Sequence, residues 1–179
     1  MALKGADSVA RNAEIKARVR DYAAFLERAS ALSDGPGATL QQEDTFYRTE
    51  SGRLKLRKVD GAGELIYYHR PDTAGASECD YDVARVDYET TARVLGGALA
   101  VRGTVRKQRR LFMHGRTRIH VDRVEGLGDF AELEVILAPG ESGEDGRAVA
   151  EGLMARLGIR AEDLVDCAYI DLIERRGSP

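Results

Sequence analysis

Charged or polar side chains alternate with apolar ones in four short segments of the chain. In a β-strand, side chains two residues apart point to the same face, so each segment would carry one charged face and one apolar face. The charged or polar positions are Glu14/Lys16/Arg18, Arg53/Lys55/Arg57, Arg116/Arg118/His120/Asp122 and Glu132/Glu134. Apolar residues such as Ile15, Leu56 and Leu133 lie between them. The alternation therefore predicts strands with one charged face each.

The same pattern, read together with turn and capping residues, predicts the remaining elements. Asp21 is placed to cap a helix at its start, and Gly158 is placed to end another. Further helices are expected at residues 87–99, 143–157 and 164–173. Strands are expected at residues 12–20, 39–48, 53–59, 63–70, 77–83, 101–113, 116–124 and 129–138.

This set of elements predicts an α+β fold in which the charged strand faces meet. A half-exposed sheet with its charges in water would show the same alternation, but it gives no reason to separate basic strands from an acidic one. A closed antiparallel β-barrel with helices packed outside gives such a reason. Because an unpaired ion in a dry core costs several kcal/mol, the lumen is expected to be wet or filled by a ligand.

Composition bounds the class of protein. A chain of 179 residues with 43% hydrophobic and 32% charged residues suits one domain, here residues 12–175 after a flexible tail at 1–11. The net charge of −3 gives no argument for a nucleic-acid partner. It conceals a basic region at residues 102–123, where eight basic residues accompany the single acid Asp122.

Cysteine usage and apolar runs suggest where the protein works. Cys79 and Cys167 have no closely spaced partner, so neither a disulfide framework nor a zinc site is expected, and a cytoplasmic location is predicted. No apolar run approaches the ~18–20 residues of a membrane span, and the first residues lack the apolar core of a secretory signal. We therefore expect no membrane partner.

The charged rows indicate a polyanionic ligand with a metal ion. Guanidinium groups bind phosphate oxygens through paired hydrogen bonds, and lysine acts as a point charge. Carboxylates beside them would not help phosphate binding alone, but they could hold a hard cation, Mg2+ or Mn2+, against the phosphates.

Several landmarks together resemble the CYTH family of triphosphate tunnel metalloenzymes, which includes class IV adenylate cyclases and thiamine triphosphatases. The resemblance runs from about Asn12 to Asp171. It rests on the segments Glu14–Arg18, Arg53–Arg57 and Lys107–Arg109, and most specifically on residues 121–134, VDRVEGLGDFAELE. It implies an eight-stranded closed tunnel in which basic residues bind a triphosphate and acidic residues bind the metal.

The resemblance also implies roles for individual residues. Lys16, Arg18 and Arg57 would act in catalysis. The triphosphate would be bound by Arg53, Lys55, Arg57, His69, Arg70, Lys107, Arg109, Arg116 and Arg118. The metal would be held by Glu14, Asp122, Glu132 and Glu134, and Glu78 and His120 are further possible residues of the site. Plainer alternatives exist for these positions. Arg53, Lys55 and Arg57 could form a solvated strand face, and Glu132 and Glu134 an exposed pair. Arg116, Arg118 and His120 could cover an edge strand, and Glu78 and Asp80 could face solvent.

Two positions depart from the family pattern. The family's Glu-x-Glu-x-Lys motif, laid on Glu14, Lys16 and Arg18, has a base in place of its middle acid. The strand before Pro71 has His69 where the family has a basic residue, with Arg70 next to it. Near the C-terminus, Tyr169 and Asp171 resemble a segment that plugs one tunnel mouth, although an amphipathic helix with Ile170 and Ile173 would account for them equally well.

Three functions remain open at this point. The first is a class IV adenylate cyclase-like enzyme that converts ATP to cyclic AMP and pyrophosphate. The second is a hydrolase of thiamine triphosphate, inorganic triphosphate or a nucleoside triphosphate. The third is a non-catalytic protein that binds nucleotides or polyphosphate. In each case the expected partner is a small triphosphate, and the protein would be a monomer or a homodimer.

Overall fold

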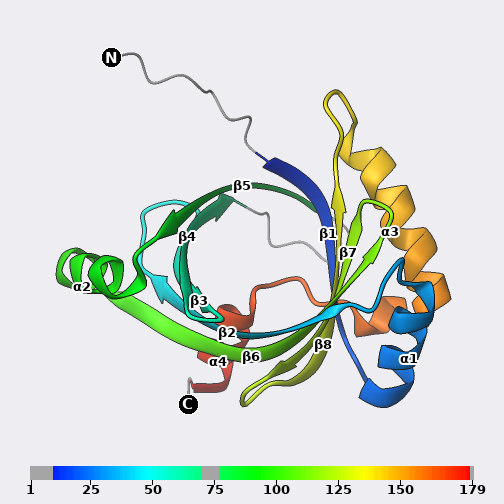
Figure 1. The fold of residues 1–179 in the computed structure, drawn as a ribbon, viewed down its shortest axis with the longest axis horizontal. Coiled ribbons are helices and arrows are strands. Elements are labelled where there is room, and N and C mark those ends of the chain that lie inside the picture. The colour runs from blue at the N-terminus through cyan, green and yellow to red at the C-terminus, as the bar shows by residue number, and fades with distance from the viewer. Residues whose placement is uncertain (1–9, 70–76, 178–179) are drawn as a thin grey trace.

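The described residues, 10–69 and 77–177 of a computed structural model, form a strand-rich fold with helices on its outside (Figure 1). The strands are β1 (Ala10–Arg18), β2 (Ala38–Tyr47), β3 (Arg53–Val59), β4 (Ala62–His69), β5 (Ser77–Val86), β6 (Val101–His114), β7 (Thr117–Val124) and β8 (Gly128–Ile136). The helices are α1 (Tyr22–Leu32), α2 (Tyr88–Ala98), α3 (Gly143–Leu157) and α4 (Tyr169–Gly177), with a 3-10 turn at Ala161–Asp163.

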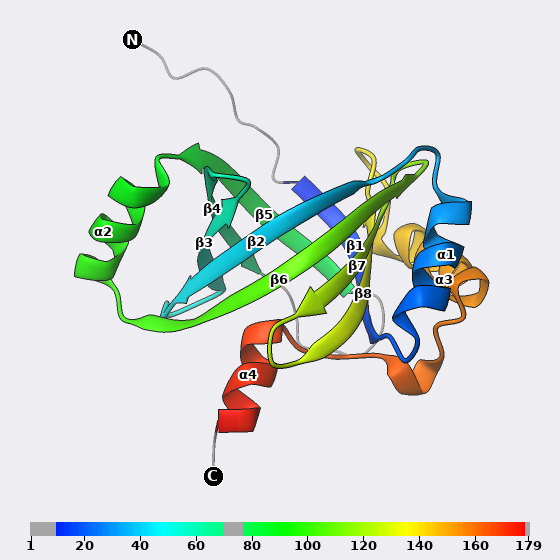
Figure 2. The same ribbon diagram turned by 60° about the horizontal axis from the view of Figure 1, so that its bottom comes forward.

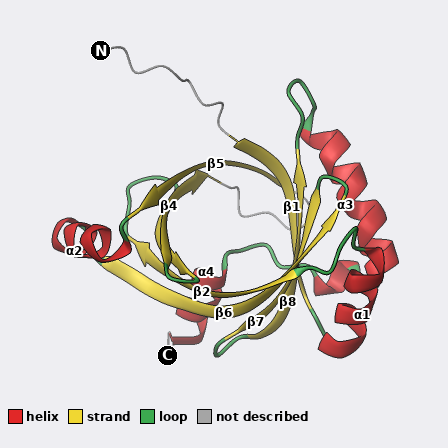
Figure 3. Ribbon diagram, viewed as in Figure 1, coloured by secondary structure: helices red, strands yellow, loops and turns green. Residues whose placement is uncertain are grey.

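The eight strands close into one antiparallel barrel. Their order around the wall is β1-β5-β4-β3-β2-β6-β7-β8, and β8 pairs again with β1. Figure 3 shows the strands enclosing a central space while the helices stay outside it. The predicted α+β fold with a closed eight-stranded barrel is thus confirmed.

Two helices cover the outer wall on one side. α1 and α3 pack on β1, β7 and β8, where the odd-numbered residues of β1 and β7 point outward. Ile15, Ile119 and Leu133 are at most 1% exposed there, and Phe25 of α1 packs against them. Burying each such side chain stabilises the fold by about 1.5–3 kcal/mol. This core fixes which strand faces remain for the interior.

Local sequence signals set the ends of these helices. Asp21 caps α1, because its Oδ1 accepts a hydrogen bond from the Ala24 N–H at 3.0 Å. Gly158 ends α3 at a φ of +73°, in the left-handed region that glycine adopts without steric cost. Both residues act as the sequence predicts.

α2 connects β5 to β6 and lies on the outside of the barrel, next to β3 and β4 (Figure 2). It has no fully buried residue, and Asp87 caps its first turn by accepting from the Thr90 N–H at 2.9 Å.

None of the described helices combines the length and the apolar character that crossing a bilayer requires.

The C-terminal segment differs from the predicted helix at residues 164–173. α4 begins only at Tyr169, and the residues before it run extended beside β1, where the Val165 N–H donates to the Lys16 carbonyl at 2.9 Å. Asp171 accepts from the Ala168 N–H at 2.8 Å and so caps the helix at its observed start. The periodicity was read correctly, but the backbone pairing with β1 delays the helix.

Two further boundaries concern residues near the gaps. β1 begins at Ala10, so Ala10 and Arg11, which were predicted to belong to a tail at 1–11, are part of the sheet. Residues 1–9 lie outside the described part of the chain, as does Arg70, so the structure gives no position for that predicted ligand of phosphate.

Candidate active site

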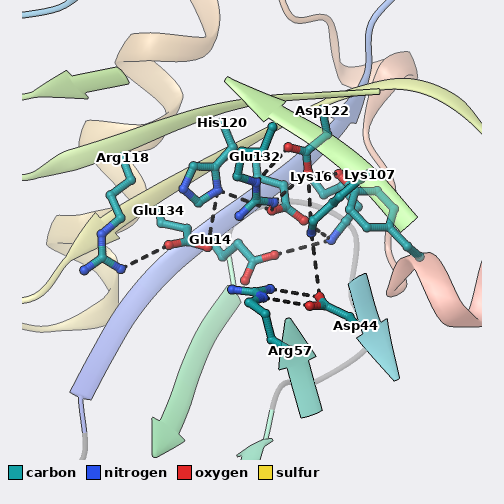
Figure 4. A network of polar contacts seen from close by, with 12 residues as sticks. Glu14, Lys16, Asp44, Arg57, Lys107, Arg118, His120, Asp122, Glu132 and Glu134 are labelled. Carbon is teal, nitrogen blue, oxygen red and sulfur yellow. Dashed lines mark hydrogen bonds and ion pairs between the residues drawn. The ribbon is translucent and has the colours of Figure 1, made fainter. Parts of the chain in front are cut away.

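The barrel interior holds a cavity of about 450 Å³ with charged walls. Every second residue of a strand points into it, so the predicted charged faces do meet (Figure 4). The acidic, basic and histidine side chains that line it are Glu14, Lys16, Asp44, Lys55, Arg57, Glu64, Lys107, Arg109, Arg118, His120, Glu132 and Glu134.

One group of cations surrounds Asp44 of β2. Arg57 binds this carboxylate through two hydrogen bonds of 2.7 and 2.8 Å, and Lys55 Nζ lies 3.2 Å from it. Lys107 Nζ is 3.9 Å away. Burial by itself would raise the pKa of Asp44, but Arg57 and Lys55 outweigh it and hold that pKa well below its ordinary value. Asp44 is therefore an anion that lies among Arg57, Lys55 and Lys107. These three residues are predicted to bind phosphate and are called the phosphate clamp below.

Sequence reasoning missed Asp44. Its strand carries only one acid on the inward face, between Gln42 and Phe46, so the alternation of charge that marked the other strands is absent. The sequence carried only one signal for Asp44, its even position on the strand, which puts it on the same face as Gln42. On the neighbouring strands, Asp44 lies opposite Arg57 of β3 and Val105 of β6.

A second group of ion pairs centres on Arg109 of β6. Its guanidinium binds Asp122 with Nε 2.7 Å from Oδ1, and it also contacts Glu132. Lys107 Nζ lies 3.7 Å from Asp122. Burial, followed by the charge of Arg109, lowers the pKa of Lys107 to about 8, although Asp122 and Asp44 pull it back up. Lys107 is therefore a lining cation whose charge can change near neutral pH.

The acidic part of the site contains a histidine. Ligand atoms of His120, Glu132 and Glu134 all lie within 4.8 Å of one another. Burial tends to raise the pKa of Glu132, but Lys16 and Arg109 hold it well below its usual range, and His120 is the chief group that lowers the pKa of Glu134. Two ionised carboxylates and an imidazole fit a divalent cation in donor type, so these residues could hold the predicted metal.

The other predicted metal ligands lie differently. Glu14 faces Glu134 across the β1–β8 ladder, at the edge of the His120–Glu132–Glu134 group. Asp122 is fully buried and is paired with Arg109, Lys107 and the Tyr169 hydroxyl. It therefore lies among basic partners and outside the His120–Glu132–Glu134 group. The side chain of Glu78 is outside the described set.

Tyr169 of α4 also lines the cavity. Its hydroxyl donates to Asp122 Oδ2 at 3.0 Å, and the ammonium groups of Lys16 and Lys107 lie 4.6 and 5.0 Å from its ring centroid. Burial and the nearby Asp122 raise the pKa of Tyr169 well above its ordinary value, so the phenol stays a donor. α4 packs its apolar side chains against the barrel, as the amphipathic interpretation expects, and the role of this segment as a plug stays a prediction.

Several predicted residues lie away from the cavity lining. Arg116 falls in the turn before β7, where it is exposed and paired with Glu141. Arg53 binds Asp171 of α4 at 3.0 Å. Arg18 and His69 are exposed, and the Arg18 guanidinium lies 5.0 Å from the Phe130 ring centroid. For Arg116 the prediction fails because the strand starts one residue later than expected, so parity does not decide its direction.

The inward face of β1 begins at Asn12, which changes how the family motif fits. Asn12 is 3% exposed and lines the cavity together with Glu14 and Lys16. Glu-x-Glu-x-Lys therefore matches Asn12-Ala13-Glu14-Ile15-Lys16, and the missing acid is the first one. Lys16 is then the motif's lysine, and it lies 2.8 Å from Glu132. Asn12 carries no charge, so the alternation of charged residues in the sequence begins only at Glu14.

Comparison with known proteins agrees with this geometry. A protein named adenylate cyclase CyaB from Aeromonas hydrophila is 26% identical over 172 residues, which are 90% of this chain and 88% of that protein. A solved Pyrococcus horikoshii protein superimposes with a TM-score of 0.80 at 24% identity and covers 90% of this chain and 98% of its own.

A second solved structure is of a proposed adenylyl cyclase from Hippeastrum that is described as having a dominant triphosphatase activity. Its TM-score is 0.66 at 20% identity, with 94% of this chain and 97% of that one covered. The CYTH domain pattern matches residues 10–169, which span every strand of the barrel and its charged lining. The chain therefore belongs to the CYTH family.

Proposed function

We propose that the protein is a metal-dependent enzyme that acts on a triphosphate, and that its reaction converts ATP to cyclic AMP and pyrophosphate. The observation that carries the proposal is that basic residues and a group of possible metal ligands share one cavity. Basic residues from β3 and β6 and the His120–Glu132–Glu134 group line the same 450 Å³ space, and Arg109 contacts Glu132.

The basic residues have donors to spare for phosphate. Arg57 uses Nε and Nη2 for Asp44, so the two N–H groups of Nη1 can bind a phosphate oxygen. Lys55 and Lys107 add point charges beside it, and Arg109 lies on the next strand but one. Charge-assisted bonds of this kind are the strongest hydrogen bonds in proteins, and they would fix the triphosphate along the wall.

A divalent cation at the acidic group, when bound, would neutralise charge that develops on the phosphates. Glu132 is buried and Glu134 is half-buried, and the pKa of each is lowered, so both carboxylates can take part without first losing a proton. Lys16 lies between Glu14 and Glu132, at 3.4 and 2.8 Å, and would orient both carboxylates.

Cyclisation requires the 3′-hydroxyl oxygen of ATP to attack the α-phosphorus in line. A new oxygen–phosphorus bond forms, the bond from the α-phosphorus to its bridging oxygen breaks, and pyrophosphate leaves as the hydroxyl gives up its proton. Positioning by Arg57, Lys55 and Lys107 would supply most of the rate enhancement, because such reactions depend on alignment and charge stabilisation.

The choice of cyclisation is supported by the relative from Aeromonas hydrophila, whose name states that activity and which matches 90% of this chain. Triphosphate hydrolysis is the second candidate, and the Hippeastrum structure favours it through the activity described for that protein. Both reactions use the same clamp, and they differ in which phosphorus is attacked and by which oxygen.

A product assay separates the candidates. Purified protein is incubated with Mg2+ or Mn2+ and with ATP, inorganic triphosphate or thiamine triphosphate, and cyclic AMP, pyrophosphate and orthophosphate are measured separately. We expect cyclic AMP and pyrophosphate in equal amounts from ATP. Orthophosphate as the main product would establish the hydrolase instead, and tight binding with no product would overturn both reactions.

A further inference from the structure

The carboxylates that face the phosphate clamp share their space with an imidazole. His120 is 4% exposed, and its Nδ1 lies 3.4 Å from Glu132 Oε2 and 3.5 Å from Glu134 Oε1. Figure 4 shows the ring between the two carboxylates on the inner wall. Of the three histidines in the chain, His114 and His69 lie outside this cavity.

These separations suit a shared cation. Two ligand atoms each about 2.1 Å from one metal ion lie about 3.0–3.4 Å apart when the angle between them is octahedral or tetrahedral. The observed 3.4 and 3.5 Å are close to that spacing. An ion pair alone would also bring His120 near the carboxylates, but Glu132 already has Lys16 and Arg109 as cationic partners.

A second observation on the same wall points to a ligand. Asn12 Oδ1 is buried, and it has no hydrogen-bond partner among the described residues. Its side chain lines the cavity two residues from Glu14, at the place of the motif's first acid. A buried amide oxygen without a partner costs stability unless something in the cavity binds it, such as a metal-bound water.

Nitrogen ligands change which metal is preferred. Mg2+ takes oxygen ligands almost always and keeps several waters. Mn2+ also favours carboxylate and water ligands, but it belongs to the transition series, whose members bind nitrogen ligands more readily than Mg2+ does. Replacement of an acid by neutral Asn12 also lowers the negative charge that would favour a hard cation through attraction alone. On the basis of the proposed function, we infer that His120 is a nitrogen ligand that makes this tunnel site select Mn2+ over Mg2+.

The direct test uses the unaltered protein. Mn2+ is added with inorganic triphosphate, and pulsed electron paramagnetic resonance measures the coupling of a nitrogen nucleus to the bound ion. Protein labelled with 15N only in histidine should replace the 14N coupling by a 15N coupling. A bound Mn2+ that shows no histidine coupling would overturn the inference while leaving the proposed metal dependence intact. Absence of Mn2+ binding with triphosphate present would overturn the proposed function itself.

A matched pair of variants provides the second test. The ratio of Mn2+ to Mg2+ affinity, measured by calorimetry with triphosphate present, should fall about tenfold or more in His120→Gln, since even outer partners of metal ligands change affinity by that factor. His114→Gln, on the outside beside Arg156, should keep the wild-type ratio. An unchanged ratio in a folded His120→Gln protein would remove His120 from the metal site.

Discussion

Arg57 and Asp44 form a two-point ion pair inside the barrel, with Nε 2.7 Å from Oδ1 and Nη2 2.8 Å from Oδ2. The arginine proposed to bind phosphate is thus held by a carboxylate of the protein. Asp44 is 2% exposed, so the pair has little contact with water. The two hydrogen bonds fix the orientation of the Arg57 guanidinium inside the barrel.

Asp44→Asn should lower the free energy of unfolding by about 3 kcal/mol, because removal of one partner of a buried ion pair leaves the other charges uncompensated. Inorganic triphosphate should then raise the melting temperature of this variant more than that of the wild type, since it supplies the missing anion. Guanidinium and thermal unfolding with and without triphosphate measure both effects. Glu89→Gln, exposed on α2 and paired with Lys58, is the control and should change stability by less than about 0.5 kcal/mol.

The lowered pKa of Asp44 predicts that the stability of the protein depends on pH in the acid range. The pKa of Asp44 is held well below its ordinary value, so its contribution is fully present above the unfolded pKa of about 4 and is lost as the pH falls through the folded value. Guanidinium unfolding at a series of pH values from 7 to 3 should therefore show a steeper loss for the wild type than for Asp44→Asn. Parallel curves for the two proteins would contradict the assigned charge.

Arg57→Gln should weaken the binding of triphosphate by about ten- to hundredfold, which corresponds to the loss of charge-assisted hydrogen bonds worth about 1.5–3 kcal/mol. The matched control is Lys58→Gln. Lys58 is the next residue on β3, points to the other face and pairs with exposed Glu89. Calorimetric titration of both variants gives the comparison, and equal affinities would place the binding site elsewhere.

The pKa of Lys107 predicts that the affinity for triphosphate falls in alkaline solution. With a pKa of about 8, its ammonium group is charged below that pH and neutral above it, so affinity should fall as the pH rises from about 7 to about 9. Lys107→Arg keeps its charge throughout this range and should flatten the decline. The titration of triphosphate itself is common to both proteins. Identical pH profiles for wild type and Lys107→Arg would show that another group controls binding.

Two substitutions at Tyr169 separate the contribution of its hydrogen bond to stability from that of its ring contacts. Tyr169→Phe removes only the bond to Asp122 and should cost about 1.5–3 kcal/mol of stability, as for other bonds to a charged group. Tyr169→Leu should cost more, because Lys16 and Lys107 also lose the aromatic face. Unfolding measurements on both variants test the order. Tyr67→Phe, at an exposed tyrosine of β4, is the control and should lie near the wild type.

Parity along strands is the part of the fold that the sequence carries most directly. Ile15, Ile119 and Leu133 form the outer core, and Glu14, Lys55 and Glu132 line the interior, because successive side chains in a strand must point to opposite faces. Capping by Asp21 is equally local. These features follow from neighbours in the chain, so one sequence suffices to predict them.

Partner choice within the barrel depends on register between strands, which the sequence does not state locally. Asp122 and Glu132 are both inward acids, yet one joins Arg109 and Lys107 while the other also reaches His120. Asp44 lacked a charged neighbour at the same parity, and Arg116 lay one residue outside its strand. The partners of Asp122 and Glu132 follow from how β6, β7 and β8 align when the barrel closes, and those of Asp44 follow from the pairing of β2 with β3 and β6.

The ion pairs of the lining have a consequence for selectivity. Among the described residues of the wall, Arg57, Lys55, Lys107 and Arg109 all contact acids of the protein, so an arriving anion must compete with carboxylates already in place. A single orthophosphate offers too few oxygens to outcompete several such contacts at once, whereas a chain of linked phosphates engages them together. The barrel would thereby discriminate by the number of phosphates in its ligand, and it would stay unsaturated in the millimolar orthophosphate of an ordinary buffer.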